Sequence, residues 1–469
     1  MSKSLGKYAS PNDWLDALWH IRVERLSIAN LLGDRKLERG ELEFLETWST
    51  HLNQEDRSLQ LLESRLRYLL DTGDISSAEA EADRLVGMSK EAGKKAFIRR
   101  ACGWRAVVYR EQSRYSKAIA DFETAEEFAE NELQLMEIWL DKGMTLVYAN
   151  RYEEAEKMLR GVVSIAQKYN DINSQGTAWN NLGICYGQQR KSFPAIEAYD
   201  RAIALYQQTG YKLGSAMASG NLSEIYLSRG QLDKALELSR QCQKLGEESE
   251  DVISIALGQD IEGRALAELE EFSAAAACFE KSFHTFRQVD DVVSQAMCGC
   301  HLVLCLINSG RIEAAGEFIL RLEKLFSEEP GLDRDMLNTK AALLAAGGSP
   351  GQARQLLEEA LADKKNRDRD MSPVLLHLGQ LYSRQGDLHR AGEMMAIMQN
   401  LPGDQLTNLF KVKMHSAGWS LWSGCGEAEK AREQKNKGLA LLEEMAGSYT
   451  DRGIWEKYCR KKEVRALLE

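Results

Sequence analysis

Hydrophobic and polar residues follow the period of an amphipathic α-helix along most of the chain. Apolar residues recur at spacings of three, four and seven, and turn signals such as Arg229-Gly230-Gln231 and Ser309-Gly310-Arg311 separate the stretches. No stretch shows the two-residue alternation that is typical of a half-buried strand. The pattern therefore predicts an all-α chain built from pairs of helices joined by tight turns.

One alanine position recurs every 37 to 40 residues along the chain. It includes Ala155, Ala195, Ala235, Ala275, Ala315 and Ala391. A small or apolar residue lies twelve positions before each alanine, and it is glycine at Gly143 and Gly183. We expect these two columns where the helices of one pair approach most closely. A single pair cannot bury its own apolar face, so the pairs should stack into a solenoid with a continuous core.

The motif around residue 180 resembles the tetratricopeptide repeat. Residues 179–186 read Trp-Asn-Asn-Leu-Gly-Ile-Cys-Tyr and are followed by Ala195, Tyr199 and Ala202, close to the family pattern W-x2-L-G-x2-Y…A-x3-F-x2-A. The period of 40 exceeds the standard 34 and is similar to the long repeats of kinesin light chains, Leu-Gly-Asn repeat adaptors and sensor arms of bacterial signalling ATPases. The resemblance covers residues 57–440 and implies a right-handed superhelical solenoid of stacked antiparallel helix pairs.

The regularity of the repeat divides the chain into four predicted parts. Residues 1–56 read as a diverged N-terminal helical hairpin, and residues 57–330 as the regular repeat array. Residues 331–450 carry shorter, diverged repeats. The loss of regularity in the repeat after residue 330 indicates a hinge between the two parts. Residues 451–469 are expected to form one amphipathic helix that caps the last hairpin.

Composition and charge narrow the classes of partner. The chain has 469 residues and a formal net charge of −11, from 60 basic and 71 acidic residues. Nucleic acid and anionic membranes both require a cationic surface, so we expect neither as a partner. No apolar run reaches the length of a membrane span, and residues 1–10 show no secretory signal. The nine cysteines lack a disulfide spacing, which predicts a cytoplasmic protein.

The sequence offers no catalytic motif, and we expect neither an enzyme nor a small-molecule cofactor. Residues 87–94 resemble a phosphate-binding loop but have the wrong spacing and follow a helix. Cys298, His301 and Cys305 share one helix face, but Cys298 and Cys305 lie about 10.5 Å apart along the axis, too far for one zinc ion. Buried thiols at a helix contact are the favoured interpretation, and no metal is predicted.

The candidate binding residues lie on the first helix of each pair, which lines the concave face in tetratricopeptide solenoids. In the long-repeat adaptors, asparagine two residues before the small position bonds the backbone of an extended peptide, and here that position holds Asn181 and Asn221. The structural alternative is that both amides only satisfy a neighbouring helix or solvent. Asn180 and Asp260 occupy the preceding position, so the cationic clamp of the chaperone-tail-binding members is absent. The full predicted partner-binding set is Asp141, Asn180, Asn181, Gln188, Asn221, Glu224, Asp260, Arg264 and His301.

The favoured hypothesis is a non-catalytic scaffold or adaptor that binds a protein or peptide segment in its concave groove. The alternative is a regulatory sensor subunit whose surface docks on a signalling ATPase or a caspase-like protease and gates it. A peptide-regulated phosphatase is a third class, but residues 12–52 show no catalytic pair that would support it.

Overall fold

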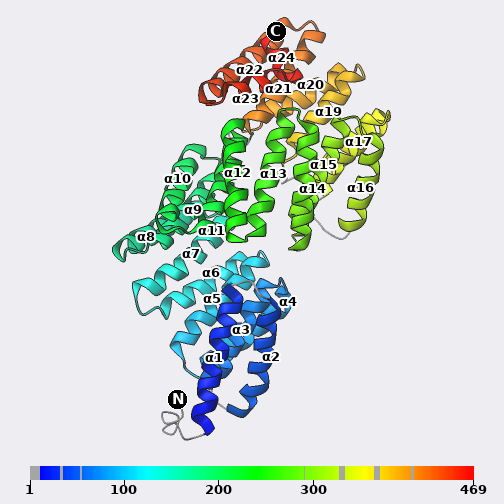
Figure 1. Ribbon diagram of the computed structural model, residues 1–469. Coiled ribbons are helices and arrows are strands. Elements are labelled where there is room, and N and C mark those ends of the chain that lie inside the picture. The colour runs from blue at the N-terminus through cyan, green and yellow to red at the C-terminus, as the bar shows by residue number, and fades with distance from the viewer. Residues whose placement is uncertain are drawn as a thin grey trace. The chain divides into compact units, whose positions relative to one another are not determined.

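The computed structural model describes residues 11–31, 35–52, 55–289, 291–326, 333–363, 370–402 and 406–469. Within these ranges the regular secondary structure is entirely helical (Figure 1). The helices are α1 (Pro11–Leu31), α2 (Arg35–Leu52), α3 (Glu55–Asp71), α4 (Ile75–Glu91), α5 (Lys95–Glu111), α6 (Tyr115–Glu127), α7 (Glu132–Tyr148), α8 (Tyr152–Lys168), α9 (Ile172–Gln188), α10 (Ser192–Thr209), α11 (Lys212–Ser228), α12 (Leu232–Ser249), α13 (Val252–Glu268), α14 (Phe272–Gln288), α15 (Val292–Asn308), α16 (Ile312–Phe326), α17 (Asp333–Ala346), α18 (Pro350–Ala362), α19 (Ser372–Arg384), α20 (Leu388–Gln399), α21 (Asn408–Gly424), α22 (Ala428–Ser448), α23 (Arg452–Cys459) and α24 (Lys462–Leu468). The predicted all-α class of stacked helix pairs is confirmed.

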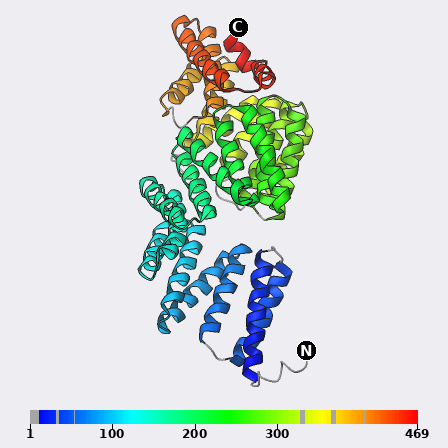
Figure 2. The ribbon, with the colours of Figure 1, turned by 60° about the vertical axis from the view of Figure 1, so that its left-hand side comes forward.

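Local sequence signals begin and end these helices. The side chain of Asp251 accepts a hydrogen bond from the Ser254 amide and so caps the start of α13. Gly230 and Gly310 adopt φ angles of 73° and 78° in the turns after α11 and α15, a conformation that favours glycine. Successive helices then pack against each other in pairs (Figure 2). None of the helices in the described ranges is long and apolar enough to cross a membrane.

The chain divides into two compact units, Met1–Cys185 and Tyr186–Glu469. We call these the first and second unit. Their boundary falls inside α9, far from the hinge expected after residue 330. Residues 327–332 lie outside the described residues, so the division between 57–330 and 331–450 stays a prediction.

The alanine column is buried in both units. The six alanines named above are at most 1% exposed. Gly143 and Gly183 are buried as well. A Cβ atom added at Gly143 would lie 2.8 Å from Cδ2 of Leu159, so a larger residue would have to displace this buried leucine between α7 and α8. The small residues therefore lie where the helices of a pair are closest.

The C-terminal residues differ from the single capping helix expected over 451–469. They form two short helices, α23 and α24, separated at Arg460-Lys461. The chain leaves the helical conformation at Lys461, whose φ and ψ angles are −58° and 138°. The second helix packs on α21 and α22, while the first contacts α12. The segment thus covers the last hairpin and also reaches back to an earlier repeat.

Hydrogen bonds tie this segment to the turn between α11 and α12. The Tyr449 hydroxyl donates to the Gly230 carbonyl at 2.5 Å and accepts from the Leu232 amide at 3.3 Å. Oδ2 of Asp233 accepts from the amide and hydroxyl of Thr450, at 2.6 and 2.7 Å, and from the Asp451 amide at 3.1 Å. We call the contacts of residues 408–467 with residues 229–271 the C-terminal seam.

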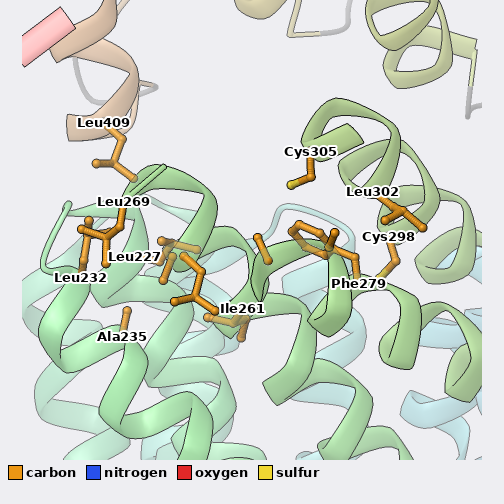
Figure 3. Packing of buried hydrophobic residues seen from close by; sticks show 14 of the residues in the cluster. Leu227, Leu232, Ala235, Ile261, Leu269, Phe279, Cys298, Leu302, Cys305 and Leu409 are labelled. Atoms are coloured by element: carbon orange, nitrogen blue, oxygen red, sulfur yellow. The ribbon is translucent and has the colours of Figure 1, made fainter. Parts of the chain in front are cut away.

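Charged and apolar contacts extend the seam to the end of α13. The two oxygens of Glu268 accept hydrogen bonds from Nζ of Lys413 and of Lys461, each at 2.6 Å. Leu409 of α21 points toward Leu232 and Leu269 and belongs with them to one buried cluster (Figure 3). Within the second unit, the C-terminal helices α21–α24 therefore pack against the earlier helices α11–α16 and share one hydrophobic core with them.

Candidate partner-binding surface

The first helices of three successive repeats, α11, α13 and α15, lie side by side in the second unit. The middle one, α13, contacts both of the others. Asp260, Arg264 and Glu268 are spaced by four residues and so share one face of α13. This face pairs with side chains from both neighbours, and we call the surface that the three helices form there the inner face.

Arg264 joins two of these repeats. Its guanidinium binds both carboxylate oxygens of Glu224 on α11, at 2.6 and 2.9 Å. It also lies 3.6 Å from the carboxylate of Asp260, one helical turn before it. Burial alone would lower the pKa of Arg264, but the two carboxylates raise it, so the guanidinium stays charged. A two-point arginine–carboxylate pair fixes both side chains in position.

Asp260 continues the network to the third repeat. Its Oδ1 lies 3.3 Å from Nδ1 of His301 and accepts a hydrogen bond from the Cys298 thiol at 3.3 Å. Burial would raise the pKa of Asp260, but the hydrogen bond and charge of His301, with the charge of Arg264, lower it below its usual value. The His301 ring also packs 5.1 Å from the ring of Phe279.

Glu224, Asp260, Arg264 and His301 form what we call the inner charged cluster. Their side chains remain 41%, 13%, 31% and 28% exposed, respectively. The structure thus brings four of the predicted partner-binding residues together on one surface. They are held by each other and keep part of their polar surface open to a further ligand.

The remaining predicted residues are distributed differently. Asn221 is half-buried on α11, and Gln188 is exposed at the end of α9. Asn180 and Asn181 are only 6% and 8% exposed, so both side chains are buried, and peptide binding by Asn181 stays a prediction. An amide that is both donor and acceptor can be buried once its groups are paired.

Asp141 belongs to the first unit, where it lies in a separate hollow. Nη1 of Arg110 approaches its carboxylate at 3.4 Å. The hollow has a volume of about 440 Å³ and is lined by Arg110, Glu111, Ser113, Tyr115, Asp141, Met144 and Tyr148. Desolvation in this hollow raises the pKa of Asp141, although Arg110 opposes the effect.

Helix α15 carries three cysteine thiols, and that of Cys298 contacts Asp260 of the inner charged cluster. Burial raises the pKa of the Cys298 thiol, which keeps it protonated and weakly nucleophilic. Cys298, Cys300 and Cys305 are all buried, as expected for thiols at a helix contact. Across the described part of the chain, no group of three or more histidine, cysteine, aspartate or glutamate side chains is arranged to hold a metal ion.

Sequence comparison identifies one family. The profile of the tetratricopeptide repeat matches residues 134–208 and 174–248. No curated protein sequence matches the chain.

Solved structures with similar folds share little sequence with this chain. The apo form of RapI has a TM-score of 0.55 and 12% identity, and the similarity covers 72% of this chain and 95% of that one. The apo form of the quorum sensor NprR from B. thuringiensis has a TM-score of 0.53 and 13% identity, with coverages of 81% and 97%. A signal-transduction ATPase with a tetratricopeptide repeat sensor from Pyrococcus horikoshii has a TM-score of 0.52 and 14% identity, with coverages of 70% and 52%. At these identities the likeness shows the fold alone.

The profile match includes the motif of residues 179–186, and the repeat columns continue on both sides of it. Paired helices, buried alanines and a 40-residue register all agree with that match. Residues 134–248 are therefore tetratricopeptide repeats, and the helix pairs on both sides of them continue the same register of about 40 residues.

Proposed function

We propose that the chain is a non-catalytic adaptor or sensor that binds a segment of a partner protein on the inner face of the second unit. The inner charged cluster is the observation that carries this proposal. Two carboxylates, a guanidinium and an imidazole from three successive repeats form one connected, partly exposed network. Such a network offers donors and acceptors to a bound chain at fixed positions.

The ion pairs reduce the loss of side-chain conformational entropy when a partner binds. The Arg264 and Glu224 side chains are already ordered by each other, so a partner does not have to immobilise them. Each hydrogen bond that the partner makes to such a charged group contributes about 1.5–3 kcal/mol. A few contacts of this kind are sufficient for a specific, reversible complex.

Other features support a protein partner in the cytoplasm. The net charge of −11 disfavours nucleic acid and anionic membranes. The nine cysteines are all free, which is typical of a reducing compartment. The similar fold of a quorum sensor and of a sensor-bearing ATPase supports a sensor role within the same class.

Photo-cross-linking in the native cell tests the proposal. A photoreactive amino acid would replace Asn221 on the inner face or, as a matched control, the exposed Glu237 on α12. We expect a partner segment attached at position 221 and absent at position 237. Attachment only at position 237 would contradict the proposal and favour a regulatory subunit that docks its outer surface on an enzyme. Phosphatase activity of the purified chain would contradict the non-catalytic assignment.

A further inference from the structure

Six apolar residues form two rows on the first halves of α11, α13 and α15. The rows occupy equivalent positions in repeats of 40 residues and lie one helical turn apart. They are Leu213, Ile253 and Val293 in the first row, and Met217, Leu257 and Met297 in the second. We call this surface the apolar ledge.

The ledge is continuous with the inner charged cluster. Ile253, Leu257, Asp260 and Arg264 are separated by four, three and four residues, so they follow one face of α13. Gly220 of α11 allows the neighbouring helix to approach, because an added Cβ would lie 2.8 Å from Cδ2 of Leu257. The ledge therefore extends the same inner face toward the start of the three helices.

Most of the ledge is open to solvent. Ile253 and Val293 are 55% and 54% exposed, and Met217 and Met297 are 47% and 40% exposed. The equivalent positions one repeat earlier hold the polar residues Asn173 and Thr177, so the apolar rows do not extend into the preceding repeat. Exposed apolar side chains gathered in register indicate a docking surface.

Negative charge flanks the ledge on both sides. At the start of the helices lie Glu247, Glu248, Glu250, Asp251 and Asp291, of which Glu248 pairs with Lys212 at 3.0 Å. On the other side, the inner charged cluster has two carboxylates against one permanent cation, Arg264. A partner that covers the ledge therefore meets net negative charge at both edges.

We propose that the apolar ledge binds an amphipathic α-helix of a partner protein, with lysine or arginine on either side of its apolar stripe. This inference rests on the proposed function and names the partner's chemistry. Packed helices lie 8–10 Å apart, and residues i and i+7 of a helix are about 10.5 Å apart along its axis. A helix laid across α11, α13 and α15 follows the two rows and can thus place successive apolar residues over successive helices of the ledge.

Fluorescence anisotropy with synthetic peptides tests this proposal on the full chain. The probe is a helical leucine–lysine peptide of about 18 residues, about 27 Å long. Its controls are a scrambled peptide that is not amphipathic and a leucine–glutamate peptide of the same pattern. We expect the leucine–lysine peptide to bind at least about ten-fold more tightly than either control and to gain helical circular dichroism on binding.

Variants locate the binding surface. Ile253→Gln with Val293→Gln should weaken binding of the leucine–lysine peptide about ten-fold, because two apolar contacts are lost. Leu320→Gln with Ile397→Gln removes exposed apolar residues of α16 and α20 and should leave binding unchanged. Unfolding midpoints of all variants, measured by circular dichroism, should match that of the parent.

Several results would overturn the proposal. Equal binding of the scrambled or acidic peptide would contradict an amphipathic, basic partner. Unchanged affinity in the ledge variant would place the peptide elsewhere, and a concentration-dependent dimer abolished by that variant would identify a second copy as the occupant. If the ledge variant still cross-links its native partner at position 221 with full yield, this inference fails while the proposed function stands. If nothing cross-links at position 221 in the parent chain, the proposed function itself fails.

Discussion

Arg264 binds Glu224 through two hydrogen bonds of 2.6 and 2.9 Å, and the two residues are 40 positions apart, one full repeat. The pair therefore links α11 and α13, the first helices of two successive repeats, at equivalent positions along their axes. Asp260 and His301 repeat the relationship between the second and third of these helices, at 3.3 Å. In the sequence, Glu224, Asp260, Arg264 and His301 are separate candidate positions for binding a partner. In the structure, hydrogen bonds and ion pairs link their side chains into one network.

The alanine column predicts a sharp difference between neighbouring alanines of α14. Ala275 is fully buried, whereas Ala277 is exposed on the same helix. Ala275→Leu should overpack the helix contact and reduce the free energy of unfolding by about 1–3 kcal/mol. Ala277→Leu should change it by less than about 0.5 kcal/mol. Urea unfolding measures both, and equal values for the two variants would mean that the column is misassigned.

Glu268 should make the free energy of unfolding of the second unit decrease at acidic pH. Burial would raise its pKa, but the charges of Lys413 and Lys461 outweigh this effect and lower the pKa far below the usual 4.5. Because the folded pKa is the lower one, the stabilisation is complete above about pH 4.5 and is lost progressively as the pH falls below it.

Glu268→Gln tests this dependence. The variant leaves two lysines without their carboxylate, so we expect it to be about 3 kcal/mol less stable than the parent at pH 7. The difference in the free energy of unfolding should be the same at pH 6 and should shrink below pH 4.5. A difference that stays constant down to pH 3 would contradict the assigned ion pairs.

Asp233 should hold the C-terminal seam closed. Its Oδ2 accepts from Thr450 and Asp451, and Asp233→Ala removes these three hydrogen bonds together. We expect amide hydrogen exchange of residues 449–461 to accelerate about ten-fold or more, with little change in α3–α6 of the first unit. Asp387→Ala provides a matched control, because that aspartate caps only its own helix, α20. Equal acceleration in both variants would show that the seam does not depend on Asp233.

The buried thiols should be inert and free of metal. Burial raises the pKa of Cys298, so native protein at pH 7.5 should react with iodoacetamide at this residue far more slowly than unfolded protein. Mass spectrometry of the labelled peptides gives both rates. Elemental analysis should find no stoichiometric zinc. One zinc per chain that is lost in Cys298→Ser would reverse this interpretation.

Periodic features of the fold were predictable from the sequence, and contacts without a period were not. The 40-residue alanine column indicated the helix pairs because every pair repeats the same packing constraint. Tyr449 and Gly230 are 219 residues apart and occur once, so no recurrence in the sequence indicates their hydrogen bond. For the same reason, the sequence predicts only a cap on the last hairpin for residues 451–469, whereas Lys461 of this segment also donates a hydrogen bond to Glu268 of α13.

The candidate site was predicted in part. The positions of Glu224, Asp260, Arg264 and His301 followed from the helical register, but their pairing depends on side-chain conformations that spacing does not determine. The register also contained the two apolar rows, which become visible when Leu213, Ile253 and Val293 are aligned at 40 residues. Burial of Asn181 could not be predicted, because asparagine is mostly exposed in folded proteins and is buried only where the tertiary structure supplies partners for its amide.

The central claim is that the inner face, and not another charged surface of the second unit, recognises the partner. Two neutralised ion pairs give a matched comparison: Glu224→Gln with Arg264→Gln on the inner face, and Arg240→Gln with Glu262→Gln. The second pair is also an interhelical contact, at 2.7 Å, but Glu262 lies on the opposite side of α13 from Arg264. Each variant replaces one glutamate by its neutral isostere and shortens one arginine to a neutral amide, so the two variants differ only in where the charges are removed.

The deciding measurement is the affinity of the two variants for the segment that cross-links at position 221, determined by isothermal titration calorimetry on proteins of equal helical content. The inner-face variant should bind about ten-fold or more weakly, because charge-assisted contacts are lost, while the Arg240/Glu262 variant should bind like the parent chain. Equal affinity of the two variants would show that the inner charged cluster only holds the repeats together, and it would contradict recognition of the partner at the inner face.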